Sequence, residues 1–360
     1  MLPQESIAKF KCKTFTDCKT CTLDKSWNEE RCQWCPLDRE CHDPSSSENP
    51  CLKNLNIVDP KLCRENKYGK YDPHSAFLHT LMSAAAYSKD PKMCLQKMNV
   101  TKDFEIKDII KHDCKDLPLF TYKECVAYTA VSHTHRVITL AFRGTRTLSS
   151  QIFDQIISVL TIPKVPFPTG GKVQRYFANA HKKLYNDVNA SVTTLVKMYP
   201  EYNFVVTGHS LGGALATLAA ATFAYQHVIP LRNMSIYTFG QPRVGDKNFA
   251  FNYDRLVNNS WRVVHNRDIV SHLPLCSLFS GCSTPENGPY HHRTEIFYPN
   301  VTMKKDSFYK ECRGDDSYNC SDGMIQKKPC TFDIKDCLTY HMNYFSLHVG
   351  RLCDHVLTRK

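Results

Sequence analysis

Residues 208–212, Gly-His-Ser-Leu-Gly, place a serine between two glycines where two different local patterns meet. Residues 203–207 before them are β-branched and aromatic, which predicts a buried strand, and residues 213–221 after them are alanine-rich, which predicts a helix. A turn this tight needs neighbours almost without side chains, and the helix N-terminus favours negative charge developing beside Ser210. A chance match is the alternative, but the flanking strand and helix favour the nucleophile elbow of a serine hydrolase.

Ser210 needs partners, because serine is a poor nucleophile at neutral pH without a histidine base and an acid that orients this base. In hydrolases with such an elbow the acid follows the serine and the histidine follows the acid. Asp268 comes just after residues 261–264, which predict a strand, and is the preferred acid. The other downstream acids lie in turn-like or cysteine-rich polar segments: Asp246, Asp254, Asp306, Asp315, Asp316 and Asp322. Spacing alone leaves the base open among His265, His272, His291, His292, His341, His348 and His355.

The cysteine content indicates an oxidising compartment. The 360 residues include 18 cysteines, an even number that predicts disulfides and an extracellular route. Six glycosylation sequons support secretion; they begin at Asn99, Asn189, Asn233, Asn258, Asn300 and Asn319. The first residues lack the apolar core of a signal peptide, so we expect that peptide to be absent from this sequence.

Charge and hydropathy narrow the possible partners. The net charge of +11 is spread along the chain, which predicts a solvated surface with weak attraction to anionic lipid. No basic-aromatic motif of a nucleic-acid reader occurs, so nucleic acid is not expected as a partner. The longest apolar run, residues 205–225, contains the elbow and its helix, so no transmembrane segment is predicted.

Residues 12–63 carry eight of the cysteines among few aliphatic residues, so cross-links must hold this segment. The Cys-x-x-Cys pairs at 18–21 and 32–35 have zinc-ribbon spacing, but four further cysteines and the compartment argue against zinc. The run Cys-Gln-Trp-Cys at 32–35 and the earlier pair resemble a plexin-semaphorin-integrin (PSI) module. This resemblance implies a spacer or protein-contact element at residues 1–67, with these pairings: Cys12–Cys32, Cys18–Cys63, Cys21–Cys41 and Cys35–Cys51.

From residue 68 onward the pattern becomes that of an α/β protein. Helices are predicted at 74–87 and 176–199, and strands at 122–130, 135–142, 235–239 and 261–264. This alternation predicts a mainly parallel sheet covered on both faces, within one domain at residues 68–360. Residues 301–337 differ, because they are polar, basic and cysteine-rich, and we interpret them as an insertion closed by disulfides.

Five motifs in order decide what spacing leaves open: Ala-Phe-Arg-Gly-Thr at 141–145, the elbow at 208–213, Gly-Gln-Pro-Arg-Val-Gly at 240–245, Arg-Asp-Ile-Val-Ser-His-Leu-Pro at 267–274 and His-Met-Asn-Tyr-Phe at 341–345. Together they resemble the class 3 (fungal-type) lipase family and its α/β-hydrolase fold. The resemblance implies Ser210 as nucleophile, Asp268 as acid and His341 as base, with Thr145 and Leu211 as backbone donors to the oxyanion. It implies no metal and no organic cofactor. His291 and His209 are expected to pack near the site without an acid-base role.

Residues 148–160 follow the expected oxyanion loop and have an apolar face at helical spacing, made of Ile152, Phe153, Ile156, Ile157 and Leu160. An ordinary amphipathic helix on the core is one interpretation. The position matches the lid of the resembled family, which would open at a lipid surface.

The sequence therefore predicts a secreted serine hydrolase that cleaves carboxylic esters of lipids, similar to a triacylglycerol lipase, through an acyl-enzyme. Within enzymes, a phospholipase A1 or a feruloyl-type esterase is the alternative, because lids and pockets vary while the elbow does not. A binding protein on a hydrolase scaffold, acting through the PSI-like module, is the alternative of another class.

Overall fold

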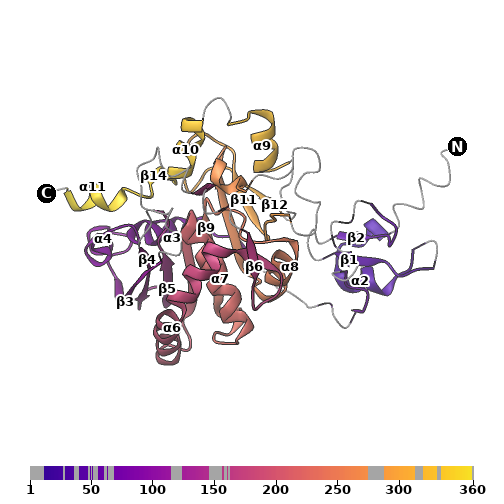
Figure 1. Cartoon of the computed structure of the whole chain (residues 1–360), viewed down its shortest axis with the longest axis horizontal. Coiled ribbons are helices and arrows are strands. Elements are labelled where there is room, and N and C mark those ends of the chain that lie inside the picture. Colours follow the sequence, from indigo (N-terminus) through magenta and orange to yellow (C-terminus); the bar gives the residue numbers. More distant parts are fainter. Residues whose placement is uncertain are drawn as a thin grey trace.

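An eight-stranded β-sheet runs through the larger part of the chain (Figure 1). In spatial order its strands are β12 (Lys310–Cys312), β11 (Glu295–Tyr298), β10 (Ser260–His265), β9 (Met234–Phe239), β8 (Asn203–His209), β5 (Val137–Phe142), β4 (Glu124–Ser132) and β3 (Phe104–Asp113). The strands from β5 to β11 are parallel, and β12, β4 and β3 pair antiparallel at the two sides. The predicted mainly parallel sheet of an α/β hydrolase is confirmed, and the carboxyl ends of its parallel strands share one edge.

The structure, a computed structural model, describes residues 12–26, 29–35, 40–47, 49, 51, 56–60, 63, 69–114, 124–145, 156–157, 160, 163–274, 288–312, 319–330 and 334–358. Its helices in the larger region are α3 (Pro73–Ala85), α4 (Pro91–Lys97), α6 (Arg175–Met198), α7 (Leu211–Tyr225), α8 (Lys247–Leu256), α9 (Ser321–Lys327), α10 (Ile334–Met342) and α11 (Leu352–Thr358), with the short 3₁₀ helix η4 (Ile269–His272). Aspartates begin several of them; the Asp72 carboxylate, for example, accepts the N–H groups of His74 and Ser75 at the start of α3.

Helices cover both faces of the sheet, and each face has its own core. Neighbouring residues of β8 show the division: Val205 belongs to the cluster under α3, whereas Val206 belongs to the cluster under α6 and α7. A strand buried on both faces reads as an uninterrupted apolar run, because successive side chains point to opposite faces. This burial explains why residues 203–207, most of β8, were recognisable as a strand from sequence.

The N-terminal cysteine-rich region contains the helix α2 (Cys18–Leu23) and a hairpin of β1 (Gln33–Cys35) and β2 (Glu40–His42). All four predicted pairings are confirmed: Cys12–Cys32, Cys18–Cys63, Cys21–Cys41 and Cys35–Cys51. The sulfur atoms are therefore engaged in disulfides, which excludes the zinc-ribbon alternative in this structure. Trp34 is buried against several of these cysteines in a small core.

The N-terminal region also contacts the larger one. Cys35 and Cys51 form a buried apolar cluster with Phe251 of α8, with Ala250 beside it, and with Tyr290. The covalent network closes within residues 12–63, but the Cys35–Cys51 disulfide is part of a packed boundary between the two regions.

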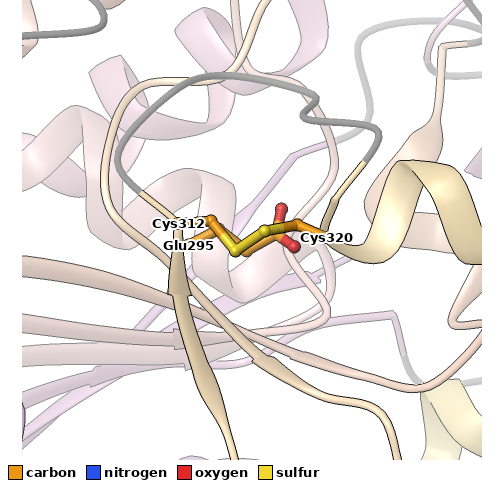
Figure 2. A group of neighbouring side chains, drawn as sticks. All are labelled: Glu295, Cys312 and Cys320. Carbon is orange, nitrogen blue, oxygen red and sulfur yellow. A yellow bond between two sulfur atoms is a disulfide. The ribbon is translucent and has the colours of Figure 1, made fainter.

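Residues 301–337 are held by two short-range disulfides, as predicted for a stapled insertion. Cys312 pairs with Cys320 and Cys330 pairs with Cys337, and Figure 2 shows the first disulfide next to Glu295. Two more disulfides are described: Cys94 of α4 pairs with Cys353 of α11, 259 residues away, and Cys114 pairs with Cys125, 11 residues away. Cys276 and Cys282 lie outside the described residues.

Three sequon asparagines are exposed, Asn99, Asn300 and Asn319, and three are half-buried, Asn189, Asn233 and Asn258. Among the helices that the structure describes, none is both long enough and apolar enough to cross a membrane.

Candidate active site

Ser210 is the single residue between β8 and α7, at the edge of the sheet where the parallel strands end. Its backbone has φ 58° and ψ −131°, a strained conformation for a residue with a side chain. Neither flanking glycine has space for a side chain. A Cβ on Gly208 would lie 2.3 Å from the Gly212 carbonyl carbon, and a Cβ on Gly212 would lie 2.3 Å from the Phe142 carbonyl oxygen. The predicted tight strand–turn–helix is confirmed.

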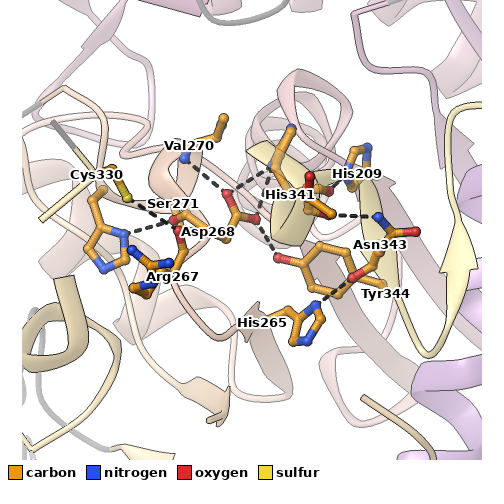
Figure 3. Close-up of polar contacts among 12 residues, drawn as sticks. His209, His265, Arg267, Asp268, Val270, Ser271, Cys330, His341, Asn343 and Tyr344 are labelled. Atoms are coloured by element: carbon orange, nitrogen blue, oxygen red, sulfur yellow. Dashed lines mark hydrogen bonds and ion pairs between the residues drawn. The ribbon is translucent and has the colours of Figure 1, made fainter. Parts of the chain in front are cut away.

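Asp268 and His341 meet beside this turn, although 73 residues separate them (Figure 3). His341 Nδ1 lies 3.0 Å from each carboxylate oxygen of Asp268, and both side chains are fully buried. Asp268 follows β10 and begins η4, where its Oδ1 accepts the Val270 N–H at 2.9 Å. His341 stands near the end of α10. The structure therefore brings together the acid and the histidine expected from sequence.

Asp268 is held as a carboxylate. Burial opposes its ionisation, but the electrostatic interaction with His341 and hydrogen bonds from His341 and Tyr344 outweigh this, so its pKa lies below the ordinary value. The Tyr344 hydroxyl donates to Oδ2 at 2.6 Å, and burial next to this charge raises the pKa of Tyr344 well above its usual range. Tyr344 therefore stays a hydrogen-bond donor to the acid.

At this site two buried polar atoms have no hydrogen-bond partner among the described residues: Ser210 Oγ and His341 Nε2. His341 uses Nδ1 for Asp268, so Nε2 is the nitrogen available to a nucleophile or a substrate. A buried polar atom without a hydrogen-bond partner lowers the stability of the fold. Such an atom is expected where a ligand or a reacting group supplies the missing hydrogen bond.

The loop after β5 packs directly against the elbow. A Cβ on Gly144 would lie 2.5 Å from the His209 carbonyl oxygen and 2.1 Å from the Tyr87 hydroxyl. Thr145 follows Gly144, and Leu211 is the first residue of α7; both are buried. The two residues expected as oxyanion donors thus lie beside the elbow on two different elements: Thr145 in the loop after β5, and Leu211 at the N-terminus of α7, which favours negative charge.

Hydrogen bonds hold the backbone of residues 341–344 at several points. His265 Nδ1 lies 2.6 Å from the Asn343 carbonyl, and His209 Nε2 lies 2.7 Å from the His341 carbonyl. Gly240, with φ +59°, allows Asp268 and His341 to lie close to the backbone, because a Cβ there would lie 2.6 Å from Asp268 Oδ2 and 2.7 Å from His341 Nδ1. Sequence reasoning assigned no role to Gly240 or Tyr344, although both stand in motifs that it singled out.

Several of the competing acids and histidines have other partners, and Asp315 and Asp316 lie outside the described residues. Asp246 begins α8, and Asp254 pairs with Arg293. His291 Nε2 lies 2.6 Å from the Ser271 carbonyl, and burial lowers its pKa well below the ordinary value, which agrees with a packing role. His272 Nδ1 lies 2.9 Å from the Asp268 carbonyl and so holds the backbone of the acid.

Three residues of the expected lid face are described. Ile156 and Leu160 are buried in the α6–α7 core, Ile157 is half-buried against it, and the Gln174 side chain donates to the Leu160 carbonyl at 3.2 Å. Ile152 and Phe153 lie outside the described residues. Opening of this segment remains a prediction.

One group has the residue types of a metal site: Glu295, Cys312 and Cys320 (Figure 2). The two cysteines form a disulfide, so neither offers a thiolate. Glu295 accepts the Ser321 N–H at 3.1 Å and faces Arg262 at 3.6 Å. This group is therefore a structural disulfide next to a carboxylate that already has a hydrogen bond and a charged neighbour.

Comparison with known proteins agrees with this geometry. Residues 139–278 match the family described as lipase (class 3). Lipase ZK262.3 of Caenorhabditis elegans is 32% identical over 327 residues, covering 83% of this chain and 89% of that protein. The lipase of Rhizomucor miehei is 32% identical over 230 residues, covering 63% of this chain and 56% of that protein. A solved triacylglycerol lipase whose catalytic centre is a serine protease triad matches with TM-score 0.62 and 28% identity, over 78% of this chain and 96% of that one.

Proposed function

This chain belongs to the class 3 lipase family, and from that premise we propose that Ser210, His341 and Asp268 form its catalytic triad. It is a carboxylic-ester hydrolase of the lipase type. The observation that carries the triad is the buried Asp268–His341 pair beside a strained serine, with Ser210 Oγ and His341 Nε2 both without a hydrogen-bond partner among the described residues.

In this proposal Ser210 Oγ attacks the ester carbonyl while His341 Nε2 takes its proton. The tetrahedral oxyanion accepts the backbone N–H groups of Thr145 and Leu211, and the proton passes to the departing alcohol as the C–O bond breaks. Water, deprotonated by the same nitrogen, then cleaves the acyl-enzyme and releases the acid. Asp268 remains ionised throughout and stabilises the imidazolium, as its lowered pKa supports.

The substrate we propose is a glycerol ester at a lipid surface. Support comes from the relatives, which include a secreted mono- and diacylglycerol lipase A of Penicillium cyclopium, 30% identical over 203 residues and covering 62% of that protein. A solved triacylglycerol lipase has the same fold over 78% of this chain. Phospholipase A1 and feruloyl esterase activities are the outcomes to be distinguished.

We also propose that the protein is secreted and built from a PSI-like module at residues 1–67 and a lipase domain at 68–360. The described disulfides support an oxidising compartment. The small cross-linked core around Trp34 supports a separate module, with protein contact as its proposed role. Residues 148–160 are proposed as a lid; the burial of Ile156 and Leu160 fits a closed state.

One labelling experiment and one substrate panel test these proposals. A fluorescent organophosphonate should attach to Ser210 in the native protein and fail to attach after denaturation, because only the folded site activates the hydroxyl. Hydrolysis of triacylglycerol, diacylglycerol, phosphatidylcholine and a feruloyl ester is then compared, below and above the solubility limit of each. Absence of labelling would exclude the nucleophile and leave the scaffold interpretation. Simple saturation through the solubility limit would exclude the lid.

A further inference from the structure

His209, the residue before the nucleophile, contacts the general base directly although the reaction sequence does not use it. Its ring centroid lies 4.6 Å from that of His341, at an interplanar angle of 30°. Figure 3 shows His209 and Asp268 flanking His341. His209 is fully buried at the end of β8, and its Nε2 lies 2.7 Å from the His341 carbonyl oxygen.

The contact determines which nitrogen of His209 carries the proton. A carbonyl oxygen can only accept, so Nε2 must be protonated. Burial lowers the pKa of His209 to about 3, so the ring is neutral and Nδ1 is bare. Nδ1 lies 2.8 Å from the Tyr87 hydroxyl, which therefore donates to it. The result is a directed chain from the Tyr87 O–H through His209 to the backbone of His341.

The acceptor of this chain is a carbonyl in the last turn of α10, where helix carbonyls lose their intrahelical partners. The Tyr87 hydroxyl also packs against Gly144, where a Cβ would clash with it, in the loop that precedes Thr145. Tyr87 and His209 thus join the backbone of the base, the elbow and the oxyanion loop.

We propose that His209, with its tautomer fixed by Tyr87, is a positioning residue that holds the backbone of His341 so that its Nε2 faces Ser210. This inference rests on the proposed role of His341 as base. Asp268 fixes one end of the imidazole, and the His209 bond fixes the main chain that carries it. Without the Tyr87 donor, Nδ1 can take the proton, and a bare Nε2 then faces the His341 oxygen and repels it.

Two amide substitutions separate positioning from packing. His209→Gln places an N–H near the position of Nε2 and keeps the donor to the His341 carbonyl, whereas the shorter His209→Asn keeps only an acceptor near Nδ1. With a soluble short-chain ester we expect kcat of His209→Asn to fall about tenfold at nearly unchanged KM, and His209→Gln to stay within about threefold of wild type. A purely structural role would lower both in proportion to their melting temperatures.

Tyr87→Phe supplies a milder test that preserves the fold, and Tyr128→Phe is its matched control. Tyr128 is also fully buried, and its hydroxyl donates to the Met82 carbonyl at 2.7 Å without touching the triad. Tyr87→Phe should lower kcat about fivefold and Tyr128→Phe should not, at similar losses of stability. In the His209→Asn background, Tyr87→Phe should cost nothing further in kcat.

Equal kcat values for His209→Gln and His209→Asn, or for the two phenylalanine variants, would overturn the proposal. Retained activity of His341→Ala would instead overturn the assignment of the base, so the two failures are distinguishable.

Discussion

The N-terminal region and the lipase region maintain their folds by different means. Residues 12–63 rely on four disulfides around a small cluster that includes Trp34. The lipase region relies on an eight-stranded sheet with a core on each face, and its shorter disulfides close local loops such as Cys312–Cys320. A short segment without a large apolar core needs covalent constraint on its unfolded state, whereas a large one does not.

The two regions also differ in how the positions of their side chains are set. The Cys330–Cys337 disulfide anchors α10, the helix that carries His341, but hydrogen bonds from Tyr344, His265 and His209 hold the segment around His341 itself. Disulfides bring segments together, but directed polar contacts between buried groups set positions within a fraction of an ångström.

The largest effect is expected in the lipase region from Ser210→Ala. Removal of the hydroxyl should lower ester hydrolysis about 10⁶-fold while the melting temperature stays the same or rises, because the nucleophile is lost with almost no volume. The loss of a strained, unpartnered hydroxyl costs the fold nothing. Turnover above background in a folded variant would contradict the assignment.

His341→Ala should cost nearly as much turnover, since triad members act as a unit. His291→Ala is its control: it removes a buried imidazole that bonds the Ser271 carbonyl, so it should lower stability by about 2 kcal/mol and leave kcat within a few-fold. Initial rates and thermal unfolding are measured on both. Loss of activity in His291→Ala alone would mean that the base has been misassigned across the cysteine-rich insertion.

Removal of single disulfides should affect the stability of the two regions differently. Cys12→Ser with Cys32→Ser should destabilise the N-terminal region by about 3 kcal/mol and leave kcat on a soluble ester unchanged. Cys35→Ser with Cys51→Ser should also loosen the contact with Phe251 and Tyr290 and so lower the melting temperature of the lipase region. Limited proteolysis, calorimetry and initial rates distinguish these results. A fall in kcat on removal of the first pair would show that the regions are not separable.

Much of this architecture was predictable, and the exceptions have physical reasons. The helix expected at 176–199 is α6 at Arg175–Met198, because a long amphipathic face leaves a strong periodic signal. Strand β3 was missed because it lies at the edge of the sheet, where exposed charges break the apolar pattern. The proposed nucleophile and the proposed acid could be selected from local sequence. The roles of Gly240, Tyr344 and His209 could not, because each depends on a contact with a residue far away in the chain.

A smaller effect is expected from Tyr344→Phe, which removes one hydrogen bond to Asp268. The expected loss in kcat is about tenfold, because the bond goes to a buried charge. This bond also lowers the pKa of Asp268, so its removal raises that pKa towards the ordinary value. The kcat of Tyr344→Phe is compared with that of the control Tyr71→Phe, whose buried hydroxyl pairs with that of Tyr298 and which should keep kcat near the wild-type value. Equal kcat values for the two variants, at similar losses of stability, would show that Tyr344 acts by packing alone.

The smallest effect concerns the stability of the lipase region in acid, where a buried and an exposed histidine are compared. In the lipase region burial lowers the pKa of His181, which lies beside the Thr222 hydroxyl, to about 4 from the ordinary 6.5. Between these values the unfolded chain binds a proton that the folded chain excludes, so stability falls as pH drops from 6.5 towards 4. His181→Gln removes this loss and should flatten the dependence by up to about 1.4 kcal/mol per pH unit. Urea unfolding at about pH 5 and about pH 7.5 measures it, with exposed His355→Gln as control. Equal slopes for wild type and His181→Gln would mean that His181 takes up its proton without unfolding.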